Sequence, residues 1–86
     1  MVVAELRIDY QVRGRTTVVA LHGTVDADRT AQVRDAVDAA RHLRRDGPIV
    51  VDLRAVDRLA PQAAVSLLRE ARESADSARP VTVRGL

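Results

Sequence analysis

Hydrophobic and polar residues alternate at the start of the chain, which predicts a β-strand with one solvated face. The alternating apolar positions are Leu6, Ile8, Tyr10 and Val12. A short turn over 13–15 contains Gly14, and the β-branched run TTVVAL at 16–21 follows it. Two strands joined by such a turn predict an antiparallel hairpin.

The segment 28–45 has the hydrophobic spacing of an amphipathic helix. Its apolar residues recur three or four positions apart, which places them on one helix face. They are Val33, Ala36, Val37, Ala40 and Leu43. Asp26 and Asp28 stand where N-terminal caps belong, and Gly47 with Pro48 ends the helix. We therefore expect a turn over 23–28 and then this helix.

A second helix is predicted to begin at Pro61, because proline is favoured at the first helical position. Its apolar stripe consists of Ala63, Ala64, Leu67, Leu68 and Ala71. Before this helix, the apolar run at 49–53 predicts a central strand, and 54–60 is expected to be a connection. After it, the segment 81–83 predicts a last strand.

The predicted elements follow the order β-β-α-β-α-β. A right-handed crossover in each β-α-β step puts both helices on the same side of the sheet. The expected fold class is therefore α/β, with a four-stranded mixed sheet and the helices on one face. The polar side of the first strand agrees with a sheet that is covered on one face only.

The length and composition indicate one small domain. A chain of 86 residues is too short to divide into several cores, so we expect a single domain over 1–86. No apolar run reaches the roughly 18 residues that a membrane span requires. The N-terminal segment also lacks the basic start and long apolar stretch of a signal peptide. We therefore expect a cytoplasmic protein without membrane insertion.

Charge and candidate chemistry argue against nucleic-acid binding and catalysis. All 14 cations are arginine, interleaved with aspartate along the chain, and the formal net charge is only +2. Cysteine is absent, and His22 and His42 have no serine or cysteine nearby in sequence to act as a nucleophile. Asp52 is expected to be a hydrogen-bonded structural acid, since isolated buried carboxylates are unstable. We expect no nucleic-acid partner, enzyme activity, metal site or cofactor.

Three segments together resemble the STAS domain, the family of anti-sigma factor antagonists and sulfate-transporter C-terminal domains. Residues 18–30 (VVALHGTVDADRT) look like the family's apolar strand and Gly-Glu-Leu-Asp motif, with Gly23 and Asp26 on its Gly and Asp. Residues 49–53 (IVVDL) look like its central strand, and 80–86 (PVTVRGL) like its next strand. The resemblance implies a non-catalytic module that binds other proteins.

The chain departs from the family pattern where the second helix begins. Partner-switching members carry Asp-Ser-Ser-Gly or Asp-Ser/Thr-x-Gly there, and a partner kinase phosphorylates the first Ser or Thr. That motif falls here on Ala60, Pro61, Gln62 and Ala63. The acceptor position is therefore Pro61, which has no hydroxyl, so no phosphorylation is expected there. Pro61 is either a signalling adaptation or an ordinary first-turn proline, and the sequence leaves both interpretations open.

The resemblance implies a protein partner. The candidates are a kinase-fold anti-sigma factor, another STAS protein or, as an alternative function, the cytoplasmic ATPase of an ABC-type lipid transport system. Without an acceptor residue, binding is expected to be constitutive or controlled elsewhere. The expected partner surface consists of Asp26, Asp28, Arg58, Pro61 and Gln62. Asp26 has the alternative role of a helix cap.

Family domains usually continue beyond the last strand with a further helix. The printed chain ends at Leu86, so we expect uncovered apolar area near the last strand and on the first helix. The helix residues concerned are Val33, Val37 and Ala40. Exposed apolar patches mark interfaces, and a free strand edge invites pairing. We therefore expect a homodimer or a heterocomplex.

Overall fold

The computed structural model describes residues 5–44 and 46–85. Two strands, β1 (Arg7–Arg13) and β2 (Thr16–Val25), form the first hairpin. A single 3-10 turn, η1 (Ala27–Arg29), leads into helix α1 (Thr30–Leu43). Strand β3 (Ile49–Leu59), helix α2 (Pro61–Ser74) and strand β4 (Val81–Arg84) follow. This order confirms the α/β fold class expected from the sequence.

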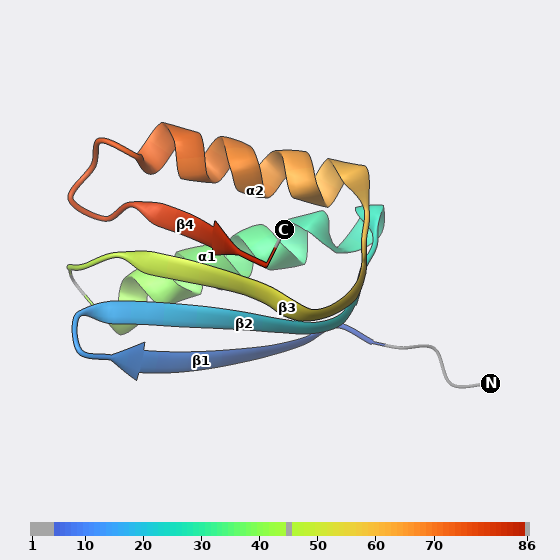
Figure 1. Ribbon diagram of the computed structural model, residues 1–86, viewed down its shortest axis with the longest axis horizontal. Coiled ribbons are helices and arrows are strands. Elements are labelled where there is room, and N and C mark those ends of the chain that lie inside the picture. The colour runs from blue at the N-terminus through green and yellow to red at the C-terminus, as the bar shows by residue number, and fades with distance from the viewer. Residues whose placement is uncertain (1–4, 45, 86) are drawn as a thin grey trace.

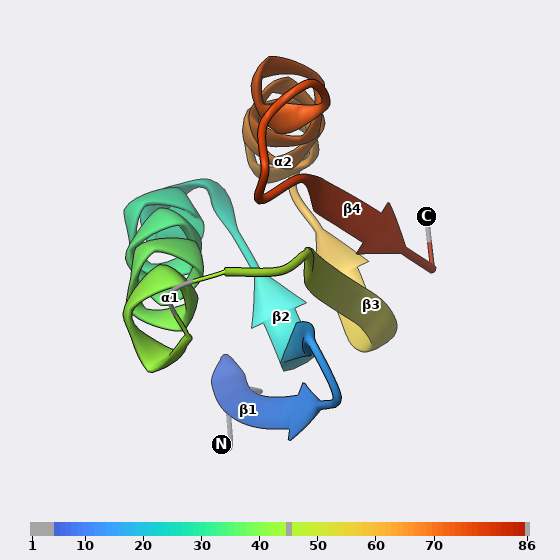
Figure 2. The same cartoon turned by 90° about the vertical axis from the view of Figure 1, so that its left-hand side faces the viewer.

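The strands form one mixed sheet in the order β1-β2-β3-β4. The β1–β2 pair is antiparallel, whereas β2–β3 and β3–β4 are parallel. Both helices lie on the same side of this sheet, and its other face carries no helix (Figures 1 and 2). The parallel pairs require crossovers, and right-handed crossovers place α1 and α2 together. The expected four-stranded sheet with helices on one face is confirmed.

The core lies between the sheet and the two helices. The helix-facing side chains of β2 include Val19 and Leu21, both fully buried. Ile49 and Val51 of β3 lie beside them at 0% exposure, and α2 contributes Leu67. The buried cluster contains no aromatic residue. Small aliphatic side chains let both helices approach the sheet closely, so two helices are enough to bury these positions.

The expected uncovered face of α1 is wrong. Val33 and Val37 are each 2% exposed and Ala40 is 0% exposed, and Val81 of the last strand is also buried at 3%. The physical reason is that α1 packs against β2, β3 and α2 at once. The exposed large apolar residues lie elsewhere. They are Tyr10, Val12, Leu43, Val65 and Leu68.

Two strands extend further than the sequence predicts. The segment 54–60, expected to be a connection, is mostly the second half of β3, and β2 continues through 22–25. The register between β2 and β3 shifts after Ala20 and again after Gly23, and β3 gains one residue relative to β2 each time. These bulges break the alternation of buried and exposed positions, so the sequence pattern conceals the strand.

Helix boundaries and faces also differ in part. Helix α1 begins at Thr30 rather than residue 28, because a 3-10 turn occupies the preceding three residues. It ends at Leu43, and Arg45, the expected end, lies outside the described residues. Leu43 and Leu68, both expected in the buried stripes, are 53% and 51% exposed. The apolar stripe of each helix is broader than the part of the helix that contacts the rest of the core. The residues at the edge of the stripe therefore stay exposed to solvent.

Candidate functional site

The residues expected to bind a partner meet at one edge of the sheet. Strands β2 and β3 are parallel, so their carboxyl ends reach the same edge, where η1 and α2 begin (Figure 1). Val25 pairs with Leu59, and the Ala60 amide donates to the Val25 carbonyl at 2.7 Å. The segments that follow Val25 and Leu59 are therefore held side by side. We call Asp26, Asp28, Arg58, Pro61 and Gln62 the helix-start surface.

Asp26 acts as a cap in this structure. Its Oδ1 accepts a hydrogen bond from the Arg29 amide at 3.1 Å, and its Oδ2 lies 3.9 Å from the Arg29 Nε. The capped element is the 3-10 turn, since α1 itself has no side-chain cap at its first turn. The Asp26 side chain stays 52% exposed. Asp28, within the same turn, is exposed as well.

Pro61 occupies the first position of α2, as the sequence predicts. Ala60 before it is extended, with φ −64° and ψ 144°, which is the conformation that proline favours in its predecessor. The Ala60 carbonyl accepts the first backbone hydrogen bond of the helix, from the Ala64 amide at 3.1 Å. No side chain caps this helix start. A first-turn proline explains the local geometry completely.

A shallow hollow of about 500 Å³ continues from the helix-start surface along the outside of α2. It is lined by Pro61, Gln62, Val65, Ser66 and Arg69. Val65 is 55% exposed, although it is aliphatic and lies in the middle of a helix. Val65 is not among the residues that the sequence predicts for the partner surface. The spacing of Val65 could have revealed it, because this residue lies one helical turn after Pro61 and outside the buried stripe of α2.

Comparison with known proteins decides the family. The family model described as "Mlab, STAS domain" matches residues 8–86.

The chain belongs to the STAS domain family. A solved structure described as "Crystal Structure Analysis of Mglu" has the same fold, with a TM-score of 0.66 at 21% sequence identity. The match covers 87% of this chain but only 18% of that one, so this chain spans a small part of the solved relative. A search of curated proteins found no match. STAS domains are in general non-catalytic modules that bind other proteins.

The hydroxyl residues nearest the start of α2 along the chain and across the sheet are partly or fully covered. The Thr30 Oγ1 is buried and has no hydrogen-bond partner among the described residues. Thr24 is half-buried within β2, and Ser66 is half-buried on α2. The four residues from Leu59 to Gln62 carry no hydroxyl. Pro61, which the resemblance places at the family's phosphoacceptor position, therefore has no hydroxyl, and the absence of phosphorylation there stays a prediction.

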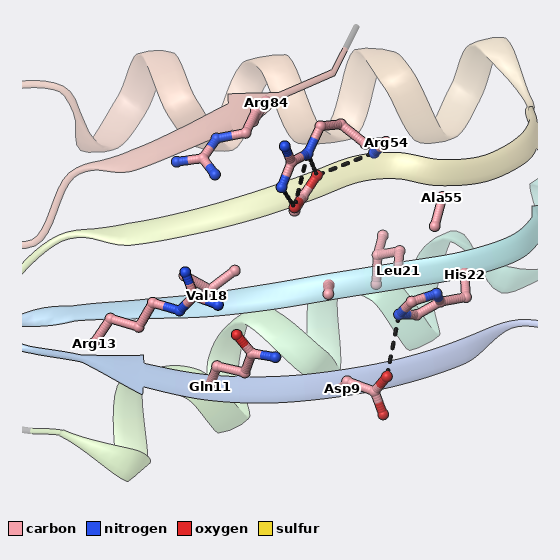
Figure 3. Close-up of a pocket in the computed structure, with 11 residues that line it drawn as sticks. Asp9, Gln11, Arg13, Val18, Leu21, His22, Arg54, Ala55 and Arg84 are labelled. Carbon is pink, nitrogen blue, oxygen red and sulfur yellow. Dashed lines mark hydrogen bonds and ion pairs between the residues drawn. The ribbon is translucent and has the colours of Figure 1, made fainter.

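The other face of the STAS domain sheet holds its second polar cluster (Figure 3). Asp52 accepts hydrogen bonds from the Arg54 side chain through both carboxylate oxygens and from the Arg54 amide at 3.0 Å. These bonds, from the guanidinium above all, lower the pKa of Asp52 below its ordinary value. Asp52 is thus a hydrogen-bonded acid, as expected. Nearby, the His22 Nε2 lies 3.1 Å from the Asp9 Oδ2.

Metal and membrane chemistry find no support in the described part of the STAS domain. Residues 5–44 and 46–85 contain no group of three or more His, Cys, Asp or Glu side chains arranged to hold a metal ion. No helix among them has the length and apolar character needed to cross a membrane. His42, the second histidine, places its Nδ1 2.8 Å from the Asp38 carbonyl on the exposed side of α1.

Proposed function

We propose that this STAS domain is a cytoplasmic, non-catalytic regulatory module that binds a protein through the helix-start surface without being switched by phosphorylation. The observation that carries the proposal is Pro61 at the first position of α2. Proline has no hydroxyl and its ring fixes the helix start. The binding surface therefore has one state, and we propose that residues 1–86 act as a single domain.

The charge of the helix-start surface explains why the missing acceptor matters. A phosphate at this position adds roughly −1.5 to −2 charges. Asp26 and Asp28 already place two carboxylates there, both exposed to solvent. A phosphoryl group beside them disrupts a docked partner by like-charge repulsion. With Pro61 in place no such repulsion arises, so binding is constitutive or is controlled in the partner.

The partner we favour is a kinase-fold anti-sigma factor or another STAS protein. The helix-start surface contains an exposed cation, Arg58, together with the exposed carboxylates of Asp26 and Asp28. Rim charges of both signs around a small apolar centre steer association and set the register of a protein interface. Here the apolar centre is formed by Pro61 and Val65.

A second candidate is an accessory subunit bound to the cytoplasmic ATPase of an ABC-type lipid transport system. The exposed aliphatic residue Val65 in the α2 hollow favours it. Permanent interfaces are more hydrophobic than transient ones. The apolar hollow lies beside a surface on which we expect no phosphorylation to release the partner. This combination fits a subunit that stays bound to its complex.

We also propose that the chain associates with itself or with a partner over a second area. Tyr10 and Val12 lie on the helix-facing side of β1, at 41% and 49% exposure. The Arg44 guanidinium donates to the Gly14 carbonyl at 2.9 Å, so the end of α1 that bears Leu43 lies over the same hairpin. This area replaces the α1 face that the sequence suggested.

The absence of catalysis is part of the proposal. His22 is paired with Asp9, as a general base often is, but the described residues that line the hollow beside them include no serine, threonine or cysteine. A nucleophile within hydrogen-bond reach of the base is required for covalent catalysis. We therefore expect no turnover of nucleotides, esters or phosphoesters, and nucleic acid is not the expected partner.

Photo-crosslinking in the native host tests this function. A crosslinking amino acid placed at Gln62 is expected to trap a kinase-fold protein, another STAS protein or an ABC ATPase. The same amino acid at Ala39, on the exposed side of α1, is the matched control and should trap none of them. The variant Val65→Asp should abolish the Gln62 crosslink while the amide spectrum of the domain stays unchanged. Equal crosslinks from both positions would overturn the proposal.

The missing switch is tested separately. Incubation with the trapped kinase-fold partner and ATP should leave the protein unmodified, as mapped by mass spectrometry. Phosphate on Ser66, Thr24 or Thr30 would show that the switch had moved to another residue. Pro61→Ser is expected to restore acceptance only in part, since Ala60 and Ala63 also differ from the family motif.

A further inference from the structure

The helix-free face of the sheet contains a hollow unrelated to the helix-start surface. Its volume is about 460 Å³, within the roughly 300–1,000 Å³ typical of small-ligand sites. Val18 and Ala20 of β2 form part of its lining, and the surrounding side chains come from β1, β3 and β4. One hollow therefore collects residues from all the strands of the sheet.

Three arginines line this hollow from three different strands. Arg13 stands at the end of β1, Arg54 in the middle of β3 and Arg84 at the end of β4. Figure 3 shows Arg13 and Arg84 at the same end of the open face, one on each side of the β2–β3 pair. Nothing in the local sequence links these residues, since the sheet order alone brings them to one surface.

The carboxylates of the hollow are already engaged by other groups. Asp52 is held by Arg54 at 2.9–3.2 Å, and Asp9 lies against His22. Ion pairs among the described residues include none to Arg13 or Arg84. Two guanidinium groups therefore line the hollow without a close ion pair, although the charges of Arg84 and Asp52 attract each other at longer range.

We propose that this hollow binds a doubly charged oxyanion, a phosphate monoester or its equivalent, between Arg13 and Arg84. A guanidinium presents paired N–H donors that match phosphate oxygens in a bidentate arrangement. Two guanidinium groups balance the two negative charges of a dianion. A ligand with a single carboxylate would leave one of the two arginine charges unbalanced. Gln11, which also lines the hollow, offers a neutral donor beside them.

Asp52 and Arg54 have a positioning role in this site. Arg54 donates to both oxygens of Asp52 and fixes this carboxylate, which attracts Arg84 by its charge without forming a close ion pair to it. The Asp52 side chain is only 13% exposed, so the pair also closes one side of the hollow. The site and the helix-start surface use different residues, and either can fail without the other.

Amide-resolved NMR titration with inorganic phosphate tests the proposal. At constant ionic strength, the amides of Val18, Ala20 and Arg84 are expected to shift and saturate with phosphate, and to respond at least tenfold more weakly to acetate. The double variant Arg13→Gln/Arg84→Gln should weaken binding at least tenfold. Arg34→Gln, an exposed arginine on α1, is the matched control and should leave binding unchanged.

A second arm distinguishes free phosphate from a lipid headgroup of the same chemistry. Phosphatidylcholine vesicles with and without phosphatidic acid are sedimented with the protein. If the protein sediments only with vesicles that contain phosphatidic acid, and the double variant does not, the bound group is the lipid headgroup. If the protein binds phosphate saturably but does not sediment with these vesicles, the bound group is the free ion. Binding in neither arm, or phosphate shifts identical in the double variant and in Arg34→Gln, would overturn the proposal.

Discussion

Arg54 holds both carboxylate oxygens of Asp52, its neighbour two positions earlier on the same face of β3, at 2.9 Å for the closest contact. Side chains two apart on a strand point the same way, so this pair forms within one element. It occupies the helix-free face of the sheet and leaves the buried side of β3 entirely aliphatic.

Replacing Arg54 should raise the pKa of Asp52. In Arg54→Gln the hydrogen bonds from the guanidinium are lost, so the pKa of this carboxyl is expected to rise toward its ordinary value. A pKa lowered by folding stabilises the native state above the unfolded pKa, and that stabilisation is lost as the pH falls through the folded pKa. Carbon-detected NMR titration of Asp52 measures this shift. An unchanged midpoint would contradict the assigned cause.

Leu67 and Leu68 are a matched pair of neighbours on α2. Leu67 is 2% exposed and Leu68 is 51% exposed. Leu67→Ala removes buried methyl groups and leaves a cavity, so it should lower the free energy of unfolding by about 2–5 kcal/mol. Leu68→Ala should change it by no more than about 0.5 kcal/mol. Urea unfolding of both variants checks the difference, and similar losses would refute the observed orientation of α2.

Ser74 joins the end of α2 to the start of β4. Its Oγ donates to the Glu70 carbonyl at 2.8 Å and accepts from the Val81 amide at 2.9 Å. Ser74→Ala leaves the buried Val81 amide unpaired, so we expect a loss of about 1–3 kcal/mol. Ser77→Ala, at an exposed serine of the same loop, should have a smaller effect. In hydrogen exchange, Ser74→Ala should selectively lower the protection of Val81.

Gly23 is required by a close backbone approach. Its φ is +96°, and a Cβ there would lie 2.4 Å from the Glu5 carbonyl oxygen. Gly14 also has a positive φ, +60°, but a Cβ there would meet nothing within 4 Å. Gly23→Ala should therefore destabilise by about 1–3 kcal/mol from backbone strain alone, with the steric conflict added. Gly14→Ala should be milder. Thermal unfolding that ranks them in reverse would contradict this assignment.

The motif glycine and aspartate of the STAS resemblance now have physical explanations. The sequence placed Gly23 on a family position without showing why glycine is needed there, and it gave Asp26 the role of a helix cap as one of two interpretations. Gly23 lies at a register shift between β2 and β3, and Asp26 caps the 3-10 turn that follows β2. The reason at Gly23 is a close backbone approach between separate segments, whereas the reason at Asp26 is a hydrogen bond to a residue three positions along the chain. The family resemblance identified both positions, and only the cause at Gly23 needed the tertiary structure.

Local patterning determined the order of the elements, the alternation of β1, and the start of α2 at Pro61. These properties depend on residues a few positions apart, through the period of the strand, the period of the helix and the fixed φ of proline. The continuation of β3 to Leu59, the burial of α1 and the placement of Arg13 and Arg84 around one hollow were decided only by the tertiary structure. All three features depend on residues that are distant in sequence. No local pattern encodes the pairing register of the strands or the helix packing that brings these residues together.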